Sequence, residues 1–162
     1  MIGVKLEKYI WTDKDFNIMD WHDVTVHAIA ITPKDDCYER QLNIDYIFEW
    51  IQPREVSGAY SFRISPATLV FENVWDIKSN ITTRINVLEN INMLEVIADD
   101  ISNDKSNIGM KSWKIVLNQG AIEFIGSGFK QYIRNKPILS ESIWLDDEER
   151  NGISFSRNMN AG

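Results

Sequence analysis

The segment Leu42-Asn-Ile-Asp-Tyr-Ile-Phe-Glu-Trp50 decides the fold class, because apolar and polar side chains alternate along it. Such alternation predicts a half-buried β-strand, in which successive side chains point to opposite faces of a sheet. One face carries Ile44, Tyr46, Phe48 and Trp50, and the other carries Asn43, Asp45, Ile47 and Glu49. We therefore expect the first face to line an apolar core and the acidic side chains of the second face to be solvated.

Further strands are predicted on both sides of this segment. Alternation along Val24–Ile31 groups Ile29 with His27, and we expect both faces of this strand to be covered. Tyr60–Ile64 is a third strand, and Pro66 is expected to end it or to place it at a sheet edge, because proline donates no backbone hydrogen bond. The remaining predicted strands are 68–75, a hairpin of 113–117 with 121–125, and 129–132.

Glycines mark the turns in the second half of the chain. Gly120 follows Asn118-Gln119 and can adopt the positive φ that a short hairpin requires, and Gly126-Ser-Gly128 allows a bend. Residues 82–101 fit either a helix or two short strands around Glu89-Asn90, and their isoleucines and valines favour strands. The polar residues 102–111 predict a loop.

These patterns predict a mainly β protein, a single-domain antiparallel β-sandwich or open barrel with little helix. The domain is expected to span residues 1–155, and residues 156–162 are expected to form a flexible tail because they lack apolar anchors. A chain of 162 residues can bury a core without disulfides. Its six tryptophans are expected to supply much of that core.

Charge and cysteine content restrict the function classes. With 17 basic and 24 acidic residues, the net charge is −7, which disfavours nucleic acid and anionic membranes as partners. Cys37 has no internal disulfide partner and is expected to be an incidental loop residue in a reducing compartment. Neither a signal peptide nor an apolar membrane span is recognisable, so we expect a cytoplasmic protein. The 23 isoleucines suggest an AT-rich bacterial genome.

Candidate binding residues gather around the two histidines and the central strand. They are Trp21, His22, Asp23, His27, Asp45 and Glu49. A metal site is disfavoured because His22 and His27 differ in strand parity, and a bulge that could realign them is not signalled. We expect His22 or Asp23 to cap a turn and Trp21 to pack in the core. Nucleophile and phosphate-loop motifs are missing from the sequence, so we predict no catalytic residues and no cofactor.

An ordered series of segments adds a resemblance. Trp21-His-Asp23 precedes one predicted strand, Asp45-Tyr-Ile47 lies in the next, and Ser65-Pro-Ala-Thr-Leu-Val-Phe-Glu-Asn-Val74 follows. Glu123-Phe124 and Gly128–Tyr132 complete the series. The chain thereby resembles a family of small uncharacterised bacterial proteins and, more loosely, immunity-type proteins encoded beside bacterial toxins. The resemblance spans roughly residues 15–155, and it implies no catalytic residues.

Three function classes follow from the sequence. The first is a non-enzymatic protein-binding module, which the immunity-type resemblance favours. The second is a small-ligand carrier, which needs an apolar cavity of roughly 300 Å³ or more inside a closed barrel. The third is a hydrolase that uses His22, Asp23 and Asp45, which must then lie within hydrogen-bond reach of one another. A homo-oligomer formed through an exposed edge strand is compatible with all three.

Overall fold

A computed structural model of the chain describes residues 8–82, 89–99 and 109–159. These residues form one large antiparallel sheet with almost no helix, which confirms the predicted mainly β fold. The strands are β1 (Ile10–Thr12), β2 (Val24–Lys34), β3 (Cys37–Ile51), β4 (Ser61–Ile81), β5 (Glu89–Asp99), β6 (Lys111–Leu117), β7 (Gly120–Gly126), β8 (Gly128–Ile133) and β9 (Ile138–Ser140). The helices are the 3-10 helix η1 (Asp13–Ile18) and α1 (Asp147–Arg150), and neither is long and apolar enough to cross a membrane.

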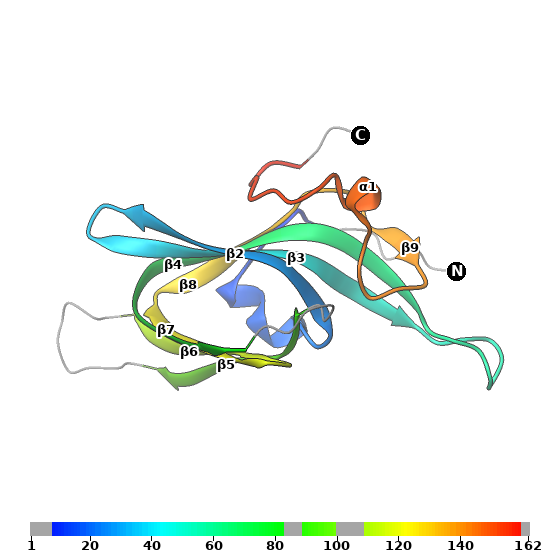
Figure 1. Cartoon of the computed structure of the whole chain (residues 1–162), viewed down its shortest axis with the longest axis horizontal. Coiled ribbons are helices and arrows are strands. Elements are labelled where there is room, and N and C mark those ends of the chain that lie inside the picture. The colour runs from blue at the N-terminus through cyan, green and yellow to red at the C-terminus, as the bar shows by residue number, and fades with distance from the viewer. Residues whose placement is uncertain (1–7, 83–88, 100–108, 160–162) are drawn as a thin grey trace.

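The sheet closes partly into a ring because β4 is long enough to pair with strands of both layers. Its first two thirds pair with β3, and its last residues, from Trp75 to Ile81, pair with β7. The ring runs β4–β3–β2–β5–β6–β7 and back to β4, while β8, β9 and β1 extend the sheet outside it. In Figure 1, β2 and β3 lie in one layer and β5, β6 and β7 in the other, with η1 (blue) between them.

An aromatic core fills the space between the two layers. Phe71 lies at its centre, with ring centroids 4.8 Å from Phe124, 5.4 Å from Trp113 and 5.7 Å from Phe129. Phe16 of η1 adds a further ring, 5.9 Å from Trp113, so the helix closes this part of the interior. These tilted and edge-to-face contacts are the favoured geometries of aromatic pairs.

Turns in the second half of the chain follow the predicted glycines. β6 and β7 form the expected hairpin, and Gly120 has a φ of 144°. A Cβ atom at Gly120 would lie 1.8 Å from the carbonyl oxygen of Asn80 on β4, so glycine is required there by the close approach of two strands. Ser127 separates β7 from β8, and both strands pair with β4.

Two local predictions about strands were wrong. Pro66 does not end a strand, because β4 continues through it: Pro66 lies where pairing passes from β9 to β8, so its missing N–H leaves no gap in the ladder. On β2, a register shift between Val26 and Ala28 leaves His27 as an extra residue. Ile29 therefore packs against the apolar core, on the opposite side from the predicted one.

The structure describes part of the ambiguous region 82–101 and part of the predicted tail 156–162. Glu89–Asp99 forms one strand, β5, so the favoured strand is confirmed there, whereas Glu89-Asn90 is not a turn. Residues 83–88 and 100–108 of these predictions lie outside the described residues. In the predicted tail, the Thr68 hydroxyl donates to the Ser156 carbonyl (2.7 Å), and Arg157 pairs with Glu39. Residues 160–162 of that prediction lie outside the described residues.

The prediction that tryptophans form the core holds for only part of the set. Trp21 and Trp113 are buried, and their indole N–H groups donate to Gln131 Oε1 (2.9 Å) and to the Gly126 carbonyl (3.2 Å). Trp50 and Trp75 are each 41% exposed, and Trp144 is 44% exposed. Of these exposed indoles, Trp50 belongs to the candidate site.

Candidate binding surface

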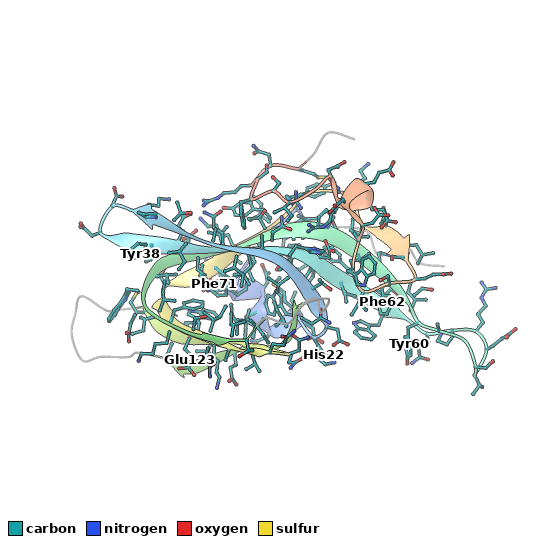
Figure 2. The ribbon with its side chains drawn as sticks, in the orientation of Figure 1. His22, Tyr38, Tyr60, Phe62, Phe71 and Glu123 are labelled. Carbon is teal, nitrogen blue, oxygen red and sulfur yellow. The ribbon has the colours of Figure 1, made fainter. Side chains whose placement is uncertain are left out.

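Three aromatic side chains form an ordered surface at one end of the molecule. The rings of His22 and Trp50 stack at 6.2 Å with an interplanar angle of 17°, and Tyr60 meets Trp50 edge-on at 6.0 Å. Figure 2 shows His22, Phe62 and Tyr60 in the right-hand half of the molecule, with Tyr38 near its left-hand tip. We call His22, Trp50 and Tyr60 the aromatic surface.

The aromatic surface rests on buried side chains. Phe62 is buried directly beside Trp50, with the ring centroids 5.0 Å apart at 81°. Phe62 belongs to a small apolar cluster on the outer face of β3 and β4, together with Ile47, Ile64 and Leu145. The exposed rings are therefore fixed from below, which lowers the conformational entropy that a partner would have to remove on binding.

The loop that carries His22 is held by polar contacts. The Asp20 carboxylate accepts a hydrogen bond from the His22 N–H (2.9 Å), and the Asp20 N–H donates to the Tyr46 hydroxyl (3.2 Å). Burial raises the pKa of Tyr46 to about 12, so this hydroxyl stays protonated at neutral pH. Asp23 follows with a positive φ of 63° and donates its N–H to the Ile91 carbonyl (2.9 Å). The turn around His22 is therefore tied to both β3 and β5.

Acidic side chains border the aromatic surface. Asp20 is exposed, and the Asp23 carboxylate lies 3.5 Å from His22 Nε2. Glu49, next to Trp50 in sequence, pairs with Arg63 at 3.4 Å. Asp20 and Asp23 therefore give the aromatic surface an acidic border, whereas Glu49 and Arg63 form a cross-strand ion pair on the face of the sheet opposite to Trp50.

A second group of predicted residues lies elsewhere, on the outer face of the sheet. Asp45 is fully buried, and its carboxylate accepts hydrogen bonds from His27 Nε2 (2.6 Å), the Leu145 N–H (2.8 Å) and Arg150 Nη2 (3.1 Å). Arg150 is also fully buried, at the end of α1. The prediction that Asp45 is solvated was wrong, because the C-terminal segment covers this face.

Neighbouring polar residues continue this buried group. Arg150 Nη2 donates to the Asn43 side-chain carbonyl, and the Asn43 amide donates to the Ser154 carbonyl. The Ser65 hydroxyl donates to the Asn135 carbonyl at 2.6 Å. We call Asn43, Asp45, Arg134 and Arg150 the buried polar cluster, since all four side chains are buried on the outer face or beside it.

The structure separates the predicted site residues into different environments. Trp21 packs in the aromatic core, as predicted, with its ring 5.4 Å from Phe129. His22 forms part of the aromatic surface and Asp23 borders it, whereas Glu49 pairs with Arg63 on the opposite face of the sheet. His27 and Asp45 pair with each other beneath the C-terminal segment. The groups proposed for a hydrolase thus have separate partners: His22 and Asp23 contact each other, whereas Asp45 contacts His27 and Arg150.

Metal and carrier functions find little support in the described residues. Within residues 8–82, 89–99 and 109–159, no group of three or more His, Cys, Asp or Glu side chains could hold a metal ion. The interior of the ring is filled by the aromatic core, which argues against a barrel that encloses a ligand.

A charged cleft of about 260 Å³ lies at the β2–β3 hairpin, far along the strands from the aromatic surface. Its charges are paired: Glu39 contacts Lys34 (2.8 Å) and Arg157, and Lys130 contacts Glu72 (3.1 Å). Burial raises the pKa of Glu39, but hydrogen bonds from Lys34 and Arg157 outweigh it and hold this pKa below its usual value. Cys37 lines the cleft, and its thiol donates to the Lys34 carbonyl.

Comparisons with protein-family models, curated proteins and solved structures gave no match to this chain. The candidate sites therefore rest on geometry alone. Sequence reasoning missed Trp50 and Tyr60, which it assigned to the core and to a strand end. A register shift between Ile47 and Glu49 on β3 places Trp50 opposite Phe62 on the outer face, not on the inner face predicted with Tyr46, and the alternation of the sequence does not signal this bulge.

Proposed function

We propose that this protein is a cytoplasmic, non-enzymatic protein-binding module that uses the aromatic surface to hold a basic protein partner. The observation that carries the proposal is Trp50, 41% exposed yet fixed between His22, Tyr60 and Phe62. Tryptophan and tyrosine are enriched among the residues that dominate binding energy at protein interfaces. Rigid, exposed aromatic side chains can bury area at low entropic cost.

Charge favours a basic partner over other ligands. The chain carries a net charge of −7, and Asp20 and Asp23 border the aromatic surface. Such a border accelerates association with a positively charged surface and disfavours nucleic acid and anionic membranes. The resemblance to immunity-type proteins indicates one class of partner, a bacterial toxin. A basic toxin would fit the charge and the aromatic surface together.

A comparison of two tryptophan variants tests this proposal. Trp50 and Trp75 are equally exposed, so Trp75→Ala is a matched control for Trp50→Ala. Tagged wild type and variants are expressed in the source organism, and co-purifying proteins are quantified by mass spectrometry. We expect a basic protein to be captured by wild type and by Trp75→Ala, and to be reduced tenfold or more with Trp50→Ala, since truncation of a dominant interface residue costs about 2 kcal/mol or more.

Salt gives a second readout of the same experiment. Because the proposed attraction is partly electrostatic, capture by wild type should decrease as the ionic strength of the wash rises. A captured partner that is retained equally by Trp50→Ala and Trp75→Ala would contradict the proposal. So would a partner that is acidic, since the border of the aromatic surface would repel it.

A further inference from the structure

The buried polar cluster contains more positive than negative charge. Arg134 and Arg150 are 1% and 0% exposed, and both guanidinium groups keep their charge because arginine is not deprotonated in proteins. Asp45 is the carboxylate that contacts Arg150, at 3.1 Å. In the part of the chain that the structure describes, Arg134 forms no ion pair of its own.

Several buried N–H groups of this cluster also lack acceptors. Among the described residues, Nε and Nη2 of Arg134 and Nη1 of Arg150 are buried without a hydrogen-bond partner. A buried donor that is left unpaired costs free energy, and the cost is larger for charged groups. Such groups in a native structure call for an explanation, and a bound ion that supplies acceptors is one.

The two arginines are placed close together by the sheet. Asp45 and Pro66 are directly opposite each other on β3 and β4, and the Arg134 N–H donates to the Pro66 carbonyl (2.9 Å). Pro66 therefore lies between Asp45 on one side and Arg134 on the other. Arg150 of α1 contacts the Asp45 carboxylate. Burial lowers the pKa of Arg134 and the nearby Arg150 charge lowers it further, whereas Asp45 opposes both effects. Arg134 thus lies within electrostatic range of Arg150 and Asp45, but the ion pair of Asp45 with an arginine is made with Arg150.

We propose that a small inorganic anion of the chloride class binds between Arg134 and Arg150, beneath the C-terminal segment. The anion would accept the unpartnered N–H groups and balance the second buried guanidinium. A monoatomic ion fits this place better than an organic anion, because the strands and the C-terminal segment bury all the charged groups named above. The proposal is independent of the aromatic surface.

Thermal unfolding tests the site with chloride itself as the probe. The melting temperature of the full chain is measured while chloride replaces gluconate at a constant total sodium concentration, so that ionic strength stays fixed. A ligand that binds only the native state raises Tm. We expect a saturable rise of about 5 to 10 °C once chloride reaches roughly a hundred times its dissociation constant.

Variants separate this site from a general effect of chloride. Arg134→Met removes the uncompensated cation and should abolish the chloride dependence. Arg63→Met, which removes a surface arginine paired with Glu49, should retain it. An equal Tm of the wild type in chloride and gluconate would overturn the proposal, and so would a chloride dependence that is the same in Arg134→Met as in the wild type.

Crystals of the wild type grown with bromide give a direct readout, even if Arg134→Met fails to fold. An anomalous peak within hydrogen-bond distance of the Arg134 and Arg150 guanidinium groups supports the site. A water molecule at that position, with no anomalous signal, overturns it.

Discussion

The two faces of β3 are both buried, but different chemistry closes them. Leu42, Ile44 and Tyr46 point into the aromatic core, where contact area and ring geometry supply the stability. Asn43 and Asp45 point outward, where the C-terminal segment covers them through hydrogen bonds and charge. The first face tolerates a change of apolar residue if volume is kept, whereas the second depends on every polar partner being present.

The proposed binding surface lies at the end of the outer face. Phe62 is buried there together with Leu145 of the C-terminal segment, whereas Trp50 beside it stays 41% exposed. Trp50 therefore combines a buried base with an exposed ring, which is the feature on which the proposed function rests.

Loss of an aromatic ring from the inner face should lower the free energy of unfolding more than loss of a buried charge or of a single hydrogen bond. Phe71→Ala removes a fully buried ring that contacts Trp113, Phe124 and Phe129, so it should lower the free energy of unfolding by about 3 to 5 kcal/mol. Urea unfolding followed by tryptophan fluorescence measures this change. Tyr38→Ala, an exposed aromatic residue on the same sheet, should change it by less than about 0.5 kcal/mol. Similar losses for both variants would refute the central position of Phe71.

Removal of one partner on the outer face should have the next largest effect. Asp45→Asn leaves the buried Arg150 without its counter-charge, and Arg150→Met leaves the buried Asp45 with His27 and the Leu145 N–H as its remaining partners among the described residues, so each should cost about 3 kcal/mol. The double variant should cost less than the two single variants together, with a coupling energy of about 1.5 kcal/mol. Unfolding curves of all four proteins measure this energy. Strict additivity would show that α1 is not held by this pair.

Loss of a single hydrogen bond to the C-terminal segment should lower the free energy of unfolding by less than loss of the buried ion pair. Thr68→Val keeps the volume of the side chain but removes the donor to the Ser156 carbonyl, so it should cost about 1 kcal/mol. The exposed Thr82→Val is its control and should leave the unfolding midpoint unchanged. If Thr68→Val has no effect either, Ser156 is not anchored as the structure shows.

Glu39→Gln should change the stability least, and the change should be visible only at acidic pH. Its folded-state pKa lies below the usual value, so the stability it contributes is present above its unfolded-state pKa and is lost as the pH falls through the folded-state pKa. Glu39→Gln should therefore reduce the loss of stability between neutral pH and pH values below about 4. Chemical unfolding of the wild type and Glu39→Gln at several pH values compares the two slopes, and identical slopes would contradict this role.

The inner face of the sheet could be predicted from sequence because it follows a simple period. Ile44 and Tyr46 alternate with polar residues, and the hairpin at Gly120 carries its own turn signal, so local patterns suffice. The bulge at His27 could not be predicted, since an extra residue leaves no mark on the alternation. Its effect was to move Ile29 into the core.

The candidate sites depend on partners that are far apart in sequence. Asp45 reads as solvated until Arg150, 105 residues later, is placed over it. Trp50 reads as core because the register shift between Ile47 and Glu49, which moves it to the outer face, leaves no mark on the alternation. His22 and Asp45 were among the predicted binding residues, but position along a strand does not reveal which distant segment covers a face, so the partners of Asp45 could not be predicted.

Photo-crosslinking at two matched tyrosines tests most directly whether the aromatic surface binds a partner. Tyr60 and Tyr38 are 44% and 45% exposed and lie in opposite halves of the molecule (Figure 2). Each is replaced in turn by p-benzoylphenylalanine in cells of the source organism, which are then irradiated. We predict one discrete adduct with a basic protein from position 60, lost when Trp50→Ala is added, and no such adduct from position 38. An adduct from position 38 alone, or one from position 60 that persists with Trp50→Ala, would contradict the account.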